Sequence, residues 1–311
     1  MISHIIKFIK LTKVHCAIWK SRPYKVGRYT ITLPPKHKLD VYQHSFKNYD
    51  KKLPAIARMV EAKYSVMSVI DIGANIGDTA FALRDACKAP LICIEGNPKF
   101  IPLLETNLSK LPGVIRVVPK FIGPESSDIL GKVVTVNGTA HIERGSAQDS
   151  LDRQHMKIDV TTFKELLASI ADLPEVRLIK MDTDGFDFRI ILGSINEIAA
   201  GLPVLFFEFD PSFSPKNERY EALVAMAALN GAGYLHCVIY DNYGNYIFSF
   251  SEDVSERFED LFCFLDQSRN SGGGVEYLDV CCFAEKDKDI FLQLVAAERG
   301  RQIIFDGEGG V

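Results

Sequence analysis

The stretch SVMSVIDIGANIGDT at residues 65–79 decides the fold of this chain. It passes from a run of apolar and β-branched residues into a loop that holds Gly73, Asn75 and Gly77. A helical pattern then begins at Thr79. Glycine adopts positive φ and lets a ligand approach the backbone, and asparagine tolerates left-handed geometry. The stretch therefore predicts a strand, a tight loop and a helix, with a ligand crevice at the carboxyl end of the strand.

Similar apolar runs follow along the chain, and helical patterns separate them. The runs are PLICIEG at 90–96, VIRVVPKFI at 114–122, VRLIKMD at 176–182 and PVLFFEFD at 203–210. Helices are expected near 78–88, 98–110, 161–170, 185–198 and 217–230, and Thr161 or Thr162 with Glu165 offers a capping box for the third. Strands that are apolar almost throughout are typical of a parallel sheet covered on both faces. We therefore expect an α/β fold with a doubly wound sheet.

Two features depart from this alternation. The run GKVVTVNGTAHIERG at 131–145 has β-branched residues on both sides of Asn137 and Gly138, which predicts an antiparallel hairpin. Three further β-rich runs come late in the chain: YLHCVIYD at 234–241, NYIFSF at 245–250 and VEYLDVCCF at 275–283. They favour an antiparallel strand at or near one edge of the sheet. We expect a catalytic domain over 65–311, preceded by an N-terminal lead-in over 1–64.

Charge is distributed unevenly. Residues 1–39 hold nine Lys or Arg and no acidic residue, whereas the rest of the chain carries 27 basic and 40 acidic side chains. Such an acidic body would repel phosphates, which argues against a nucleic-acid partner. In the first 20 residues, apolar positions interleave with lysines: Ile2, Ile5, Ile6, Ile9 and Trp19 with Lys7, Lys10, Lys13 and Lys20. This pattern is typical of a helix at an anionic membrane surface, or alternatively of a helix packed on the domain with its lysines in water.

Composition narrows the classes of protein to which this chain could belong. The seven cysteines are odd in number and contain no C-x-x-C pair, which argues against a disulfide framework or a zinc site. No run approaches the roughly 18 apolar residues that a membrane span requires. We therefore expect a cytoplasmic protein that can also associate peripherally with the inner membrane surface.

The loop at 73–77 points to a nucleoside ligand. A dinucleotide fingerprint has glycine at the middle position, whereas here Asn75 would crowd a diphosphate. Glu95 closes the second strand, where a carboxylate accepts hydrogen bonds from two ribose hydroxyls. Asp71 would face an amino group of the ligand, directly or through water. Phe121 and Ile122 would cover its base, or alternatively belong to the core.

Six segments carry a family resemblance: DIGANIGDT, IEGNP, VTTFKELL, LIKMDTDGFD, PVLFFEFDP and YLDVCCFAE. In this order, over roughly residues 65–285, they resemble the FkbM family of S-adenosylmethionine-dependent methyltransferases. The resemblance implies a Rossmann-like class I methyltransferase fold with a mostly parallel seven-stranded sheet. It also implies S-adenosylmethionine as methyl donor, S-adenosylhomocysteine as product and a hydroxyl acceptor, here expected on a sugar, glycan or glycolipid. The expected cofactor contacts are Asp71, Gly73, Asn75, Gly77, Thr79, Glu95, Phe121 and Ile122.

The sequence departs from the family pattern at two places. Members often have glutamate where this chain has Asp184 and Asp187, which shortens the reach of both carboxylates by one methylene. Proline is frequent where this chain has Gly96, which affects the stiffness of the loop more than the ribose contact.

Acidic residues gather where the fourth and fifth strands end. Asp182 and Glu208 close apolar runs, so we expect them to be partly desolvated, which would raise their pKa values toward the range of a general base. Asp182 is the preferred base or acceptor-orienting group, with Asp184 and Glu208 as alternates. Lys180 is either a charge partner of these groups or a solvated side chain. Asp187 decorates the start of a helix.

Several alternatives stay open. The same carboxylates suit Mg²⁺ or Ca²⁺, although the string Asp-x-Asp is too common to establish a metal site. His141 and His155 are further candidate bases or surface residues. Tyr240, Tyr243 and Tyr246 either stack on a sugar or form cross-strand pairs. Two other classes are a nicotinamide-dependent oxidoreductase, disfavoured by Asn75, and a non-catalytic scaffold.

Overall fold

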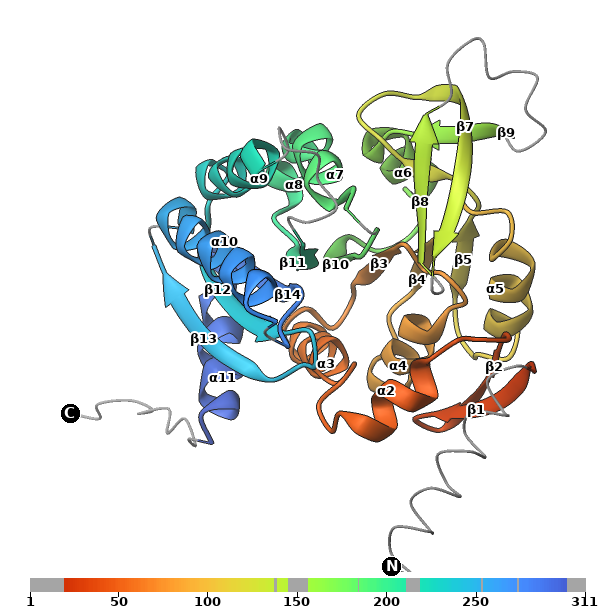
Figure 1. Cartoon of the computed structure of the whole chain (residues 1–311), viewed down its shortest axis with the longest axis horizontal. Coiled ribbons are helices and arrows are strands. Elements are labelled where there is room, and N and C mark those ends of the chain that lie inside the picture. Colours follow the sequence, from red (N-terminus) through yellow and green to blue (C-terminus); the bar gives the residue numbers. More distant parts are fainter. Residues whose placement is uncertain are drawn as a thin grey trace, which may run out of the picture.

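The computed structural model describes residues 20–136, 139–144, 156–183, 185–210, 219–252, 254–272 and 274–300. An eight-stranded sheet forms the centre of the molecule (Figure 1). In chain order its strands are β3 (Ser68–Ile72), β4 (Leu91–Ile94), β5 (Ile115–Val118), β10 (Val176–Met181), β11 (Val204–Phe209), β12 (Tyr234–Asp241), β13 (Tyr246–Ser251) and β14 (Leu278–Ala284).

The order of the strands in space is β13-β12-β14-β11-β10-β3-β4-β5. Strands β3, β4, β5, β10 and β11 pair in parallel, and β14 runs antiparallel to both β11 and β12. The strand order reverses between β3 and β10, which is where an open α/β sheet binds its ligand. The predicted α/β class and the antiparallel strand near one edge are confirmed. Strand β13, which overlaps the run at 245–250, adds an eighth strand to the seven that the resemblance implies.

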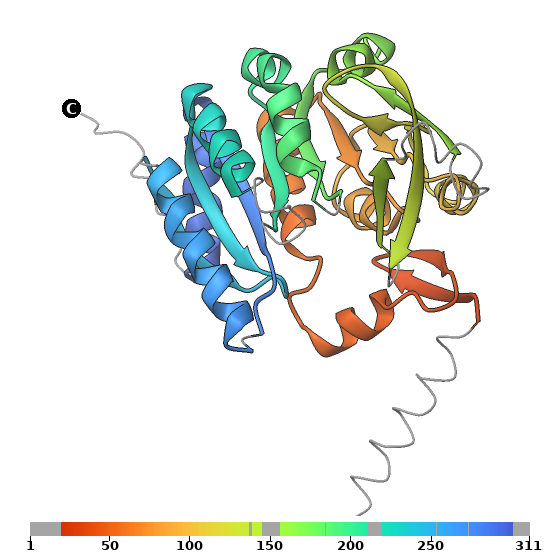
Figure 2. The same ribbon diagram turned by 45° about the horizontal axis from the view of Figure 1, so that its top comes forward.

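Helices cover both faces of this sheet, which Figures 1 and 2 show from two directions. Val204 and Phe206 point into one core, whereas Leu205 and Phe207 point into the other, as the alternation of a strand requires. The first core contains residues of α3 (Lys52–Tyr64), α4 (Asp78–Ala86), α5 (Ile101–Leu108) and α11 (Lys288–Glu298). The second contains residues of α6 (Phe163–Ser169), α7 (Asp187–Gly193), α8 (Ile195–Gly201), α9 (Arg219–Gly231) and α10 (Val254–Asn270).

A second, four-stranded sheet follows β5 in the chain. Its order is β6-β9-β7-β8, and its strands are β6 (Phe121–Ile122), β7 (Ser127–Val136), β8 (Thr139–Arg144) and β9 (Met156–Thr161). Strands β7 and β8 pair antiparallel, so the hairpin predicted at 131–145 is confirmed, with residues 137–138 outside the described range. Helix α6 then begins with the predicted capping box, in which Thr162 is the N-cap and Glu165 its partner.

Residues ahead of the first sheet strand also contribute to the core. They form β1 (Arg22–Val26), β2 (Tyr29–Leu33), α2 (Leu39–Ser45) and α3. Ile31, Leu33 and Ile56 are fully buried in the same core as residues of the central sheet. The division at residue 64 stays a prediction, and the membrane-binding helix expected at 1–20 lies almost wholly outside the described residues. Within the described ranges, no helix is both long enough and apolar enough to cross a membrane.

Candidate active site

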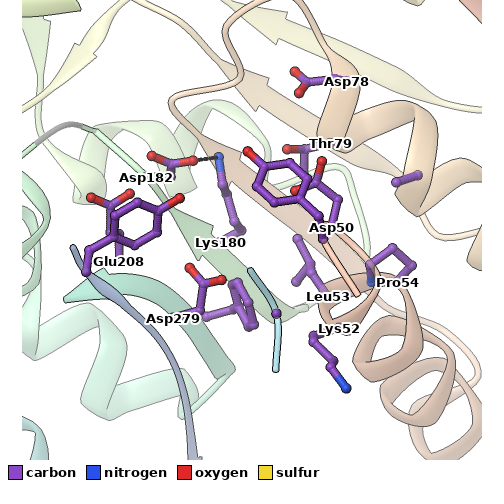
Figure 3. A pocket seen from close by; sticks show the side chains of 15 residues that line it. Asp50, Lys52, Leu53, Pro54, Asp78, Thr79, Lys180, Asp182, Glu208 and Asp279 are labelled. Atoms are coloured by element: carbon purple, nitrogen blue, oxygen red, sulfur yellow. Dashed lines mark ion pairs between the residues drawn. The ribbon is translucent and has the colours of Figure 1, made fainter. Parts of the chain in front are cut away.

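A pocket opens at the carboxyl ends of β10 and β11, beside the loop that follows β3 (Figure 3). Its walls come from the turn between α2 and α3, the start of α4, the ends of β10 and β11, the β12–β13 turn and the start of β14. The residues that line it are Tyr49, Asp50, Lys52, Leu53, Pro54, Asp78, Thr79, Ala82, Lys180, Asp182, Phe206, Glu208, Gly244, Tyr277 and Asp279. The sequence-predicted residues Asp182, Glu208 and Thr79 therefore share one cavity.

The loop at 73–77 has the backbone that its sequence predicts. Gly73, Asn75 and Gly77 adopt φ angles of 81°, 48° and 91°. A Cβ on Gly73 would lie 1.9 Å from the carbonyl oxygen of Asp182, so the glycine is required because the end of β10 packs against the loop. Contact between two strand ends is thus one reason for this glycine, and its expected role of letting a ligand approach the backbone stays a prediction.

Glu95 is buried beneath this loop and connects it to the next one. Its Oε2 accepts a hydrogen bond from the amide of Asn75 at 2.8 Å, and its Oε1 accepts one from the amide of Asn97 at 2.7 Å. Burial raises the pKa of Glu95, and these two hydrogen bonds offset part of the rise. Each carboxylate oxygen has a second lone pair, so the predicted ribose contact is compatible with both bonds.

Asp71 and Lys180 form a buried ion pair below the loop. Lys180 Nζ lies 3.2 Å from Asp71 Oδ1 and 3.3 Å from Asp182 Oδ2, and it donates a hydrogen bond of 3.3 Å to the carbonyl oxygen of Gly73. Burial alone would lower the pKa of Lys180, but Asp182 and Asp71 raise it above the usual lysine range. Asp71 pairs with this lysine, and its expected contact with an amino group of the ligand stays a prediction. Lys180 is a charge partner, and the alternative of a solvated lysine is wrong.

The two leading candidate bases differ in their exposure. The side chain of Asp182 is 48% exposed because it stands past the last residue of β10, so it is only partly desolvated. Glu208 lies one residue before the end of β11 and is half-buried. Burial raises the pKa of Glu208 well above its ordinary value, and Asp182 and Asp187 raise it further.

Glu208 also faces a second carboxylate that the sequence reasoning missed. Strand β14 runs antiparallel to β11 and places Asp279 directly opposite Glu208. Burial and then Asp182 raise the pKa of Asp279 well above its ordinary value. Like charges in directly opposite positions destabilise a sheet, and perturbed carboxylates concentrate at functional sites. The one available signal was Asp279 itself, a charged residue within the apolar run at 275–283.

The turn between α2 and α3 supplies further polar side chains that no sequence motif predicted. Asp50 enters the pocket with a positive φ of 57°, and it accepts a hydrogen bond from the side chain of Gln43. Asp50 is exposed as a whole residue, but the protein atoms packed around its carboxyl group raise its pKa to about 7, and the charge of Asp78 adds to this. The phenols of Tyr49 and Tyr277 flank the acids, and burial raises the pKa of both.

The residues expected around the base of the ligand lie outside this pocket. Phe121 is half-buried, and its ring occupies the space that a Cβ on Gly96 would need, 2.2 Å from the nearest ring atoms. This contact explains why glycine stands where proline is frequent in the resembling family. Ile122 is buried in the core between the sheet and α6, so of its two alternatives the structure supports the core.

Other candidate residues are placed as follows. Asp187 is buried at the first position of α7, where its Oδ2 accepts hydrogen bonds from the amide and hydroxyl of Thr183. Tyr240 is buried with its hydroxyl on Glu298, Tyr246 contacts its ring edge-on, and Tyr243 stacks on Phe46 with ring centroids 3.9 Å apart. All three tyrosines therefore contact other side chains of the protein. Asp184, His155 and the side chain of His141 lie outside what the structure describes.

The acidic side chains of the pocket suit the positively charged end of a cofactor. Carboxylates of Asp78 and Asp182 line the pocket next to the loop, and these groups favour a sulfonium or ammonium ion. The residues present therefore fit S-adenosylmethionine. Among the described residues, no group of three or more His, Cys, Asp or Glu side chains has the geometry to hold a metal ion.

Comparisons with known proteins place this site in a sequence family. The model of the methyltransferase FkbM domain matches residues 71–235, from Asp71 of the loop strand to the second residue of β12. A search of curated proteins finds no match.

The solved structures that resemble this chain include three methyltransferases. A methyltransferase FkbM from Methylobacillus flagellatus is 18% identical with a TM-score of 0.30, and the match covers 53% of this chain and 37% of that one. A SAM-dependent methyltransferase from Agrobacterium tumefaciens is 9% identical with a TM-score of 0.41, over 85% of this chain and 70% of the other. A precorrin-6y C5,15-methyltransferase from Geobacter metallireducens is 12% identical with a TM-score of 0.34, covering 76% and 89%. The family assignment rests on the match over 71–235.

Proposed function

Because this chain belongs to the FkbM methyltransferase family, we propose that it is an S-adenosylmethionine-dependent O-methyltransferase acting on a hydroxyl group of a sugar, glycan or glycolipid. The observation that carries the proposal is the position of Asp182. Its exposed carboxylate enters the pocket directly beside the loop at 73–77, and the loop strand β3 and β10 are neighbours in the sheet. A proton acceptor and the cofactor loop thus lie side by side.

S-adenosylmethionine, when bound, supplies an activated methyl group that needs a nucleophile in line with it. Glu95 would hold the ribose with the free lone pairs of its carboxylate, and Thr79 would contact the cofactor at the start of α4. Phe121, whose ring packs against Gly96 just after Glu95, would cover the adenine. In this proposal, these residues bind and orient the cofactor.

Asp182 would accept the proton of the acceptor hydroxyl, while the hydroxyl oxygen would take the methyl group as the sulfur–methyl bond breaks and S-adenosylhomocysteine is left. A positioned base contributes about 10²–10⁴-fold to such a rate, and alignment contributes about 7–11 kcal/mol in favourable cases. Positioning therefore matters more than the base itself. Glu208 and Asp279 lie deeper, and their raised pKa values favour the neutral acid, which donates a hydrogen bond to a polar acceptor.

Two measurements test this proposal. Calorimetry with S-adenosylhomocysteine and with NAD should show binding of the first alone. Release of S-adenosylhomocysteine, followed by mass spectrometry of the acceptor, should show a gain of one methyl group on a hydroxylated saccharide. Binding of NAD in place of S-adenosylhomocysteine would contradict the proposal, and so would methylation confined to nitrogen or carbon.

Substitution then separates the candidate bases. Asp182→Asn keeps the shape of the side chain but cannot accept the proton, so turnover should fall by about 10²-fold or more with cofactor affinity nearly intact. Glu208→Gln is the matched variant, and we expect a smaller loss because an amide still donates a hydrogen bond. If Asp182→Asn stays within threefold of wild type while Glu208→Gln does not, the roles are reversed.

A further inference from the structure

Lys180 lies at the base of the pocket and contacts both the loop at 73–77 and the carboxylate of Asp182. Its side chain is 6% exposed, whereas that of Asp182 is 48% exposed. Three oxygens surround its ammonium group at 3.2–3.3 Å: Asp71 Oδ1, Asp182 Oδ2 and the carbonyl oxygen of Gly73. One buried cation thus joins a buried carboxylate, the cofactor loop and an exposed carboxylate at the end of β10.

If Lys180 only neutralised the charge of Asp71, it would not need all three of these contacts. A buried carboxylate needs one cation nearby, and the pair with Lys180 provides it. The contacts with Gly73 and Asp182 go beyond that requirement. They also reinforce a backbone junction, because the amide of Asp182 donates a hydrogen bond of 3.1 Å to the carbonyl oxygen of Ile72. Backbone and side chain therefore fasten the same two strand ends together.

The side chain of Asp182 depends on this lysine for its position. Within the described parts of the chain, the ion pair with Lys180 is the one charge or hydrogen-bond contact that its carboxylate makes. An exposed carboxylate without such a contact samples several rotamers. Held by Lys180, it keeps a fixed distance from the loop at 73–77.

We propose that Lys180 is a positioning residue that holds the carboxylate of Asp182 in place relative to the cofactor loop. The role rests on the proposed function, in which Asp182 faces the acceptor hydroxyl. It differs from neutralisation of Asp71, and the two roles predict different results for a double variant. Misplacement of a reacting group by about 1 Å costs as much as 10²-fold in rate.

Three variants separate the two roles. Lys180→Met removes the ammonium group, keeps an unbranched side chain and leaves Asp71 buried without its cation. The double variant Asp71→Asn with Lys180→Met removes both charges, so no unpaired charge stays buried. Lys63→Met is the matched control, because Lys63 Nζ lies 3.0 Å from Asp287 Oδ1, whose side chain is 1% exposed, at the opposite end of α3 from the pocket.

The first readout is turnover together with thermal stability. We expect Lys180→Met and the double variant to lower kcat by about 10²-fold, while the Kd of S-adenosylhomocysteine changes by less than about threefold. The double variant should regain most of the melting temperature that Lys180→Met loses. Lys63→Met should lose stability and keep the wild-type kcat. A stable double variant with kcat within threefold of wild type would overturn the proposal, since Lys180 would then only neutralise Asp71.

The second readout needs no acceptor. Hydrogen–deuterium exchange followed by mass spectrometry reports on the amides of Gly73 and Asp182, which donate to Ile94 and Ile72 across the strand ends. Both Lys180 variants should exchange faster in peptides spanning 71–77 and 181–183, and Lys63→Met should not. Unchanged exchange in the double variant would refute the positioning role. If the wild-type protein methylates no hydroxyl acceptor, the proposed function fails while this experiment still decides the role of Lys180.

Discussion

At the scale of single residues, Glu95 shapes the loop and is also the proposed ribose contact. Its carboxylate connects the amides of Asn75 and Asn97, and each of its oxygens keeps a second lone pair. Contact of these lone pairs with the ribose belongs to the proposed function. Gly73 also shapes this loop, because its absent side chain makes room for the carbonyl oxygen of Asp182.

This dual role predicts the effect of Glu95→Gln. The amide retains one acceptor oxygen and turns an NH₂ group toward a backbone N–H, so a charge-assisted hydrogen bond of about 1.5–3 kcal/mol is lost. We expect at least about tenfold weaker binding of S-adenosylhomocysteine by calorimetry. Asp172→Asn is the control, because Asp172 forms an exposed ion pair of 2.8 Å with Arg116 and should bind like wild type. Unchanged affinity in a folded Glu95→Gln variant would remove Glu95 from the cofactor site.

At the scale of elements, the start of α7 carries a pH-dependent contact. Asp187 is 2% exposed, and burial raises its pKa to about 6, with Asp182 adding to the effect. The native state therefore holds a proton on Asp187 more tightly than the unfolded chain does. This group stabilises the fold below pH 4, and its contribution is lost as the pH rises through about 6.

Asp187→Asn should remove this dependence. The amide oxygen still accepts the hydrogen bonds from Thr183, and no buried charge forms at neutral pH. Relative to wild type, the variant should gain about 3 kcal/mol of unfolding free energy between pH 4 and pH 7, as two pKa units correspond to that energy. Urea denaturation at several pH values measures the difference. A stability difference that does not change with pH would show that Asp187 is ionised in the native protein across this range.

At the scale of the whole molecule, segments far apart in the chain close the pocket. Gly244 in the β12–β13 turn packs against the α2–α3 turn, where a Cβ would lie 2.3 Å from the carbonyl oxygen of Asn48. The side chains of Asn48 and Asn245 form a hydrogen bond of 2.9 Å, and Phe46 stacks on Tyr243. This contact holds Tyr49 and Asp50 at the pocket wall.

Gly244→Ala tests the closure. Its φ of 76° strains any side chain, and the clash with Asn48 adds to that strain, so we expect a loss of more than about 1 kcal/mol in stability. The KM of the acceptor should rise severalfold while S-adenosylhomocysteine binds as before. Gly272→Ala is the matched control, with a φ of 72° and open space around its Cβ, and it should leave the KM unchanged. Equal acceptor KM values for the two variants would show that the contact between these turns does not affect acceptor binding.

The N-terminal charge pattern makes a prediction at the same scale. Four lysines in residues 1–20 would contribute about 1 kcal/mol each at an anionic surface, which gives a reversible attachment that salt weakens. The full chain should co-sediment with anionic vesicles and not with neutral ones, and a chain without residues 1–20 should stay in solution. Equal binding of both chains would assign the attachment to another surface.

The sequence by itself determined the local structure, including the backbone of the loop at 73–77. Apolar runs predicted β3, β4, β5, β10 and β11, the glycine pattern predicted the backbone of the loop at 73–77, and Thr162 with Glu165 predicted the start of α6. These features depend on neighbours in the chain, whose spacing follows from the periods of a strand and a helix.

Only the tertiary structure decided the acceptor side. Lys180 meets Gly73, 107 residues earlier, because β10 lies next to β3, and Asp279 faces Glu208 because β14 inserts antiparallel beside β11. Asp50 reaches the same pocket through the turn ahead of α3, and the exposure of Asp182 depends on where β10 ends. Periodicity reports which face of an element is buried, whereas strand order and the meeting of distant side chains follow from how the elements pack. For that reason the candidate bases could be named from the sequence, while their burial, charge and partners could not.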